Sequence, residues 1–101
     1  MKAGRAPDAG GPLLLRLYVA GSAPNSTAAR RNLAILFPDG KAADRRVEVE
    51  IVDVLDEPLR GLADGVVLSP TLVRLAPLPV RRVVGNLSNH ESVLVALGVV
   101  P

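Results

Sequence analysis

The chain has 101 residues, 49% of them hydrophobic, and a formal net charge of +2, so it is long enough for one domain with its own core and too short for two. Its lack of cysteine excludes disulfides, thiolate metal sites and thiol catalysis, and its single histidine excludes a metal site made of several imidazoles. Arginines occur in adjacent pairs, but only 2% of the residues are aromatic, which favours a solvated surface over nucleic-acid binding. We therefore expect no metal, no cofactor and no nucleic acid.

Residues 1–12, MKAGRAPDAGGP, contain no apolar segment of the kind that a secretory signal needs. We expect a flexible leader there, a single domain over 13–98 and a short tail at 99–101. No apolar run approaches the roughly 20 residues of a membrane helix. No membrane is therefore expected among the partners, and the expected location is the cytoplasm.

The first predicted strand covers residues 13–19, LLLRLYV, which are apolar on both faces apart from Arg16. This pattern is typical of a central strand that is covered on both sides. A turn at 20–24 follows. Asn25 or Ser26 is then placed to cap a helix by accepting hydrogen bonds from its first free amides.

The helix that follows this turn is predicted from the spacing of its apolar residues. Ala29, Leu33, Leu36 and Phe37 recur at the intervals of one helical face. Pro38 ends the helix, because the residue before a proline avoids the α region.

A polar connection at 38–46, with a Pro-Asp-Gly turn, leads to a predicted strand at 47–55, VEVEIVDVL. The first half alternates and the second half is apolar on both faces, which indicates a strand that runs from a solvated end into the core. The alternation places Val47, Val49 and Ile51 on one side and Glu48 and Glu50 on the other.

Three shorter elements are predicted next: a helix at 59–68, a strand at 71–76 and a strand at 80–84. Pro58 opens the helical segment. Pro77 and Pro79 bracket the connection between the two strands, and Gly85 with Asn86 ends the second strand.

The last predicted helix covers residues 89–97. Ser88 and Glu91 have the spacing of a capping box, in which each side chain accepts a hydrogen bond from the other residue's amide. Gly98 stands where a helix ends. The apolar face consists of Val93, Leu94 and Leu97.

The predicted fold class is α/β, with the order βαβαββα. The first two strands, joined through a helix, should be parallel, and the last two should form a hairpin. This is the thioredoxin-like order, and Ser69-Pro70 lies where such folds usually keep a cis proline.

The chain resembles the KaiB family of circadian-clock proteins. The segments that carry the resemblance are LYVAG at 17–21, PNS at 24–26, VDVL at 52–55 with Pro58, SPTL at 69–72, PVRRVVG at 79–85 and LSNHESVL at 87–94. They lie in order, and the resemblance covers about residues 13–98.

The resemblance implies a binding module without catalysis that adopts two folds. One is a ground state, usually tetrameric, in which the second half of the domain folds differently. The other is a monomeric thioredoxin-like state that engages the ATPase ring of KaiC. A sensor kinase with its own KaiB-like domain competes there, and the bound form captures KaiA in systems that have it. The implied partners are therefore a KaiC-type ATPase, KaiA or such a kinase, and self-association to a dimer or tetramer.

Two folds of one chain must lie within a few kcal/mol of each other, so that a partner can select the minor one. Pro70, Pro77 and Pro79 divide the second half of the chain into short units. Gly85 and Asn86 can take positive φ and change the chain direction. These five residues are the predicted fold-switch hinge.

One departure from the family concerns the residues before Pro58. Family members often have Lys-Asn there, whereas this chain has Asp56 and Glu57. The sign of the charge is thus reversed near a face that the family uses for KaiC. This favours, as an alternative, a KaiB-like module that works outside a clock, on a sensor kinase or in a stress response. A thioredoxin-like enzyme is the more distant alternative.

Asp56, Glu57 and Pro58 are accordingly candidate partner-binding residues. Three strand arginines are either ordinary edge protection or further partner contacts, namely Arg74, Arg81 and Arg82. Asp53 with Asp56 is better explained as part of a polar loop than as an acid/base pair. His90 is expected to face solvent.

Overall fold

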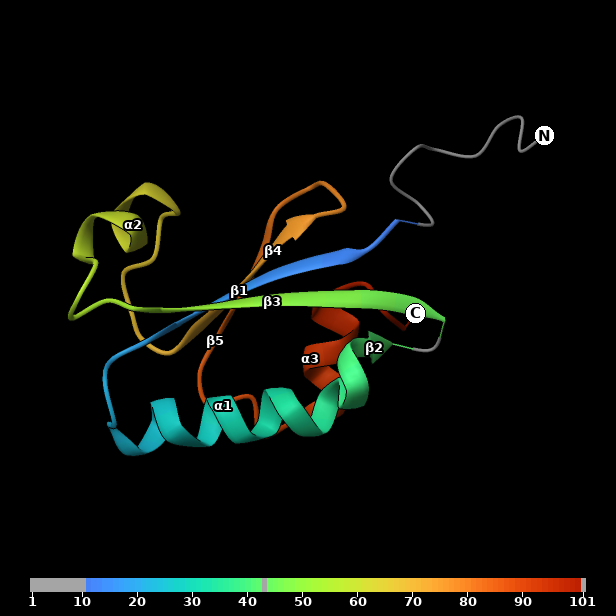
Figure 1. The fold of residues 1–101 in the computed structure, drawn as a ribbon, viewed down its shortest axis with the longest axis horizontal. Helices are drawn as coiled ribbons and strands as arrows, with labels where there is room; N and C mark the ends of the chain where they lie inside the picture. The colour runs from blue at the N-terminus through green and yellow to red at the C-terminus, as the bar shows by residue number, and fades with distance from the viewer. Residues whose placement is uncertain (1–10, 43, 101) are drawn as a thin grey trace.

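The structure, a computed structural model, describes residues 11–42 and 44–100. They form a five-stranded sheet in the order β2-β3-β1-β4-β5, with helices on both faces (Figure 1). The elements are β1 (Leu13–Val19), α1 (Pro24–Leu36), the 3-10 turn η1 (Pro38–Gly40), β2 (Lys41–Ala42), β3 (Arg45–Asp53), α2 (Pro58–Ala63), β4 (Thr71–Ala76), β5 (Arg81–Val84) and α3 (His90–Ala96).

Strand β1 is the centre of the sheet. It pairs with β3 in parallel and with β4 antiparallel, and β4 pairs with β5 antiparallel. The predicted element order, the parallel first pair and the terminal hairpin are therefore confirmed. The predicted leader at 1–12 lies outside the described residues except for Gly11 and Pro12.

The short strand β2 was not predicted. Asp39 and Gly40 both adopt positive φ, 59° and 67°, and turn the chain so that Lys41 pairs with Arg46 and Ala42 with Arg45. This pairing recruits the polar residues Arg45 and Arg46 into the sheet. Strand β3 accordingly begins at Arg45 rather than at residue 47.

Helices α1 and α3 cover one face of the sheet and α2 the other (Figure 1). The larger core lies on the first face and joins Leu13, Leu15 and Leu17 of β1 to residues of both helices. The smaller core lies under α2 and consists of Tyr18, Val52, Val66 and Val73. Strand β1 is therefore covered on both sides, as its sequence predicts.

Helix α1 begins earlier than predicted, and the expected cap at Asn25 or Ser26 is wrong. Pro24 is the first helical residue, and Ala23 before it provides no side-chain cap. A proline is well suited to this position because the missing N–H would have had no partner there. The buried Ser26 hydroxyl instead accepts a hydrogen bond from the amide of Ala20 at 2.9 Å.

The predicted capping box of α3 is also wrong. The amide of Ser88, which Glu91 was expected to bind, donates to Asn86 Oδ1 at 3.0 Å. Asn89 is the cap, and its Oδ1 accepts from the amide of Ser92 at 3.1 Å. The local turn at Asn86 thus shifts the start of the helix to His90. Gly98, with φ of 75°, ends the helix as predicted.

The proline-rich second half has three cis peptide bonds: Ser69-Pro70, Ala76-Pro77 and Leu78-Pro79. The first is the cis proline that the thioredoxin-like order predicts. Gly85 adopts positive φ, 120°, as expected, but the next residue to do so is Leu87 with 64°, rather than Asn86. A hinge role of Pro70, Pro77, Pro79, Gly85 and Asn86 stays a prediction.

Candidate protein-interaction surface

Helix α2 and the loops on either side of it carry a group of exposed apolar side chains. Their relative exposures run from 60% for Leu68 to 87% for Val67. We call this group the α2 surface; its members are Leu55, Leu59, Leu62, Val67 and Leu68. Exposed apolar side chains that gather in one place, unlike scattered ones, are typical of interaction sites.

A cavity of about 290 Å³ opens beside α2. Its walls are mainly apolar and consist of Val54, Pro58, Gly61, Leu62, Val66, Val67 and Ser69. Gly61 brings the helix close to the sheet, because a Cβ at this position would already lie 3.4 Å from Val54 Cγ1. The cavity is large enough to accept an apolar side chain from another molecule.

The loop before α2 is shaped by Asp53. Its Oδ1 accepts hydrogen bonds from the amides of Gly21 at 3.1 Å and Leu55 at 2.9 Å. Its carbonyl accepts from the amides of Asp56 and Glu57. The polar-loop interpretation of Asp53 therefore agrees with the structure. Asp56 and Glu57 follow with exposed side chains, and we call them the acidic rim.

A polar network holds α2 on the sheet. The Tyr18 hydroxyl donates to Asp64 Oδ2 at 2.5 Å and lies 3.0 Å from the carbonyl oxygen of Arg60. Arg16 bridges Asp64 at 2.7 Å and Glu50 at 2.8 Å. Arg60 reaches Glu50 at 2.9 Å. The helix is thus tied to β1 and β3 by Arg60 in its last turn and by Asp64 at its C-terminal cap.

The network shifts the pKa values of its members. Burial raises the pKa of the Asp64 carboxyl, but the hydrogen bonds from Tyr18 and Arg16 and the charges of Arg16 and Arg82 outweigh burial, so that its pKa lies below the ordinary value. Burial, with the hydrogen bond to Asp64, raises the pKa of Tyr18. The hydrogen bonds from Arg16 and Arg60 lower the pKa of Glu50.

Of the three candidate arginines, Arg74 is buried, with 5% exposure, and both of the expected roles for it are wrong. Its side chain lies on the side of β4 that faces α3. Its guanidinium donates to the carbonyl oxygens of Leu97 at 2.6 Å and Pro79 at 2.7 Å. Arg81 and Arg82 are exposed. Arg82 donates to the carbonyl oxygen of Asp64 at 2.8 Å, next to α2.

His90 is half-buried rather than solvent-facing. Its Nε2 lies 3.0 Å from Asn32 Oδ1, and Asn32 Nδ2 donates to the carbonyl oxygen of Asn86 at 2.9 Å. The imidazole therefore links α3 to α1. Because α1 passes beside the start of α3, a first-turn residue that looks exposed in the sequence is partly covered.

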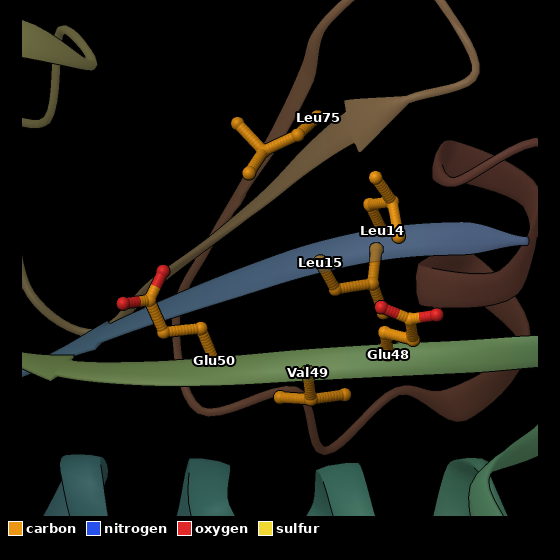
Figure 2. Close-up of a pocket in the computed structure, with 6 residues that line it drawn as sticks. All are labelled: Leu14, Leu15, Glu48, Val49, Glu50 and Leu75. Carbon is orange, nitrogen blue, oxygen red and sulfur yellow. The ribbon is translucent and has the colours of Figure 1, made fainter.

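Figure 2 shows a second hollow, of about 220 Å³, over β1, β3 and β4. It is lined by Leu14, Leu15, Glu48, Val49, Glu50 and Leu75. In Figure 2, Leu14 and Leu75 lie on the face away from α1, whereas Val49 points towards α1.

Among residues 11–42 and 44–100, no group of acidic, histidine or cysteine side chains could hold a metal ion.

The apolar residues in the alternating half of β3 are not all buried. Of its three apolar alternating residues, only Val47 is buried, whereas Val49 is 41% and Ile51 49% exposed. They border a cavity of about 200 Å³ next to Leu33 and Phe37 of α1. Because β2 pairs only with the first residues of β3, the rest of this edge has no strand beside it in the described part of the chain.

Most of the α2 surface was missed in the sequence analysis. Leu55 was placed in a predicted core strand, and the other four residues lay in the helix predicted at 59–68 without any surface role. The signal was nonetheless present, because LRGLADGVVL has apolar residues on more sides than a six-residue helix can bury. Asp64 was likewise overlooked, because its partners Arg16 and Tyr18 lie far away in the sequence.

A family model described as KaiB domain matches residues 16–99. The chain belongs to the KaiB family. The circadian clock oscillator protein KaiB of Thermosynechococcus vestitus is 41% identical to it over 85 residues, which are 83% of this chain and 76% of the relative. The circadian clock protein KaiB3 of Synechocystis sp. is 35% identical over 89 residues, 88% of this chain and 85% of the relative.

The fold of this KaiB-family chain has a counterpart among solved structures. The N-terminal domain of Synechococcus elongatus SasA aligns with a TM-score of 0.70 at 22% identity, over 95% of this chain and 93% of that domain. At this identity the likeness shows the fold alone, which is thioredoxin-like. No helix of the described residues is long and apolar enough to span a bilayer.

Proposed function

We propose that this KaiB-family protein is a non-catalytic regulator in the cytoplasm that binds a KaiC-type ATPase ring through the α2 surface. The observation that supports it best is the exposure of Leu55, Leu59, Leu62, Val67 and Leu68 around a mainly apolar cavity. When a partner removes such side chains from water, the free energy of the complex falls by roughly 25 cal/mol per Å² of buried apolar area.

The α2 surface has the features of a protein-binding site. A stable interface needs a buried apolar centre and a polar rim. The cavity beside Pro58 and Leu62 provides the centre, and the acidic rim provides polar groups at its border. The network of Tyr18 and Asp64 holds α2 in place, which reduces the entropy that the helix would lose on binding.

We propose further that the thioredoxin-like form is one of two folds, and that the partner selects it. The hinge residues Pro70, Pro77, Pro79, Gly85 and Asn86 lie at the ends of β4 and β5, where the second half of the domain would rearrange. In the other fold the protein self-associates to a dimer or tetramer. A partner that binds only one fold shifts the balance by its difference in affinity.

The test is a titration of the purified protein with the KaiC-type ATPase of its source organism in the presence of ATP. The mass of the free protein and of any complex is measured by light scattering after size exclusion. We expect a complex with the ring, and we expect Leu59→Asp with Leu62→Asp to abolish it. Ile35→Asp on α1 is the matched control, because Ile35 is also exposed but lies away from α2. Failure to bind any such ATPase would refute the proposal.

The acidic rim favours a second candidate function. In the resemblance that the sequence shows, Lys-Asn is common where this chain has Asp56 and Glu57. A changed charge at the contact face suits a changed partner, such as a sensor kinase or a component of a stress response. A gene neighbourhood with a kinase and no KaiC-type gene would favour this function. A mutant phenotype confined to rhythm would count against it. Capture of KaiA is expected only under the first proposal.

A further inference from the structure

The chemistry of the α2 surface specifies the kind of partner that fits it. We infer that the partner presents an apolar side chain, which enters the cavity beside α2, next to lysine or arginine side chains that face Asp56 and Glu57. This inference rests on the proposed function insofar as it uses the same surface. It adds the sign of the partner's charge.

The acidic rim lies directly beside the cavity. Pro58 lines the cavity, and Asp56 and Glu57 immediately precede it with exposed side chains. Their backbone is fixed, because both amides donate to the carbonyl oxygen of Asp53 at 3.1 and 2.9 Å. The two carboxylates are thus held at the border of the apolar centre, where a partner's charged side chain would meet them.

The charge of the rim is largely uncompensated within the described chain. No ion pair of residues 11–42 and 44–100 involves Asp56, and the pair between Glu57 and Arg60 is long, at 3.5 Å, with both side chains well exposed. An exposed pair of this kind contributes little. Arg60 is held more closely by Glu50, at 2.9 Å.

The other cations near α2 are also engaged. Arg16 binds Asp64 and Glu50 at 2.7 and 2.8 Å on the sheet side of the helix. Arg82 donates to the carbonyl oxygen of Asp64 at the far end of α2. The start of α2, where Pro58 borders the cavity, is therefore acidic, and a partner with acidic groups there would be repelled.

Exposed charges at the border of an interface act mainly on the association rate and on its dependence on salt. A basic partner should therefore associate fastest at low ionic strength. Asp56→Lys with Glu57→Lys should slow this association by roughly tenfold or more at low salt. Asp44→Lys is the matched control, because Asp44 is exposed just before β3, at the end of that strand opposite to the acidic rim.

Two probes test the inference. The first is the KaiC-type ATPase of the source organism with ATP, with association followed at low and high salt for the wild type, the double reversal and the control. The second is a pair of labelled helical peptides with the same central leucine, flanked by lysines in one and by glutamates in the other, titrated by fluorescence anisotropy. We expect the wild type to prefer the lysine peptide and the double reversal to prefer the glutamate peptide.

The outcomes separate this inference from the proposed function. An ATPase complex that depends on Leu59 and Leu62 but is unchanged by charge reversal and by salt would overturn the inference and leave the proposed function standing. No ATPase complex, together with a peptide preference that inverts on reversal, would overturn the proposed function and support the inference. Equal binding of both peptides by the wild type would also overturn the inference.

Discussion

The guanidinium of Arg74 donates to the carbonyl oxygen of Leu97 at 2.6 Å and thereby joins the middle of β4 to the end of α3. Leu97 is the residue at the C-terminal cap of α3, where carbonyl groups lack partners within the helix. The same guanidinium donates to the carbonyl oxygen of Pro79. Burial lowers the pKa of Arg74, and the nearby charges of Arg81 and Arg45 lower it further.

Arg74→Ala should lower the free energy of unfolding by about 2–4 kcal/mol, because the buried carbonyl group of Leu97 and the partly buried one of Pro79 lose their donor and a cavity remains. Arg81→Ala, at the position paired with Arg74 on β5, should change it by less than about 0.5 kcal/mol, because Arg81 is exposed. Urea unfolding of both variants measures the difference. Equal effects would show that the contact between Arg74 and Leu97 does not stabilise the fold.

The cap of α3 gives a second paired prediction. Asn89→Ala should cost about 1 kcal/mol, because the amide of Ser92 loses its acceptor. Ser88→Ala should have little effect, because the exposed Ser88 side chain caps nothing in the structure. Thermal unfolding of the two variants decides between the caps. A larger loss of stability for Ser88→Ala than for Asn89→Ala would instead support the predicted capping box.

Tyr18→Phe removes the hydroxyl that donates to Asp64 under α2. The ring still fills the smaller core, so the expected loss is that of one hydrogen bond to a charged group, about 1–3 kcal/mol. Hydrogen exchange should quicken first in α2, at the amides of Arg60 to Gly65. Uniform acceleration over α1 and α3 as well would instead indicate global destabilisation.

The lowered pKa of Asp64 predicts how stability depends on acid. A carboxyl whose pKa is lower in the folded state contributes stability that is complete above its unfolded pKa, about 3.9, and is lost as the pH falls through the folded value. Asp64→Asn should therefore flatten the decline of the melting temperature below about pH 5. Asp44→Asn, at an exposed position, should leave that decline as it is in the wild type. An unchanged acid profile in Asp64→Asn would contradict the assignment.

Local sequence patterns were enough for the order and type of most elements. The apolar segment at 13–19 predicted a strand covered on both faces, and β1 has cores on both sides. Pro38 correctly marked the end of α1, and Gly98 the end of α3. These features depend on burial and on backbone conformation within a few residues, which is the information that a short stretch of sequence carries.

The tertiary structure decided the features that depend on residues distant in the sequence. Arg74 looked like an edge arginine until α3 supplied the carbonyl group of Leu97, which is 23 positions away. Asp64 had no assigned role in the sequence, because its partners Arg16 and Tyr18 come from β1, more than 40 positions away. The alternation placed Val49 and Ile51 on the same side of the strand as Val47, yet only Val47 is buried.

For the candidate interaction surface, too, some features could be predicted from the sequence and others depended on the tertiary structure. The acidic rim and Pro58 could be singled out from the sequence, because their charge and backbone properties are local. That Leu59 and Leu62 face water, while Gly61 packs against the sheet, was decided by the contact of α2 with Tyr18 and Val54. A short helix with apolar residues all round buries the side that its neighbours reach, and only the packed structure shows which side that is.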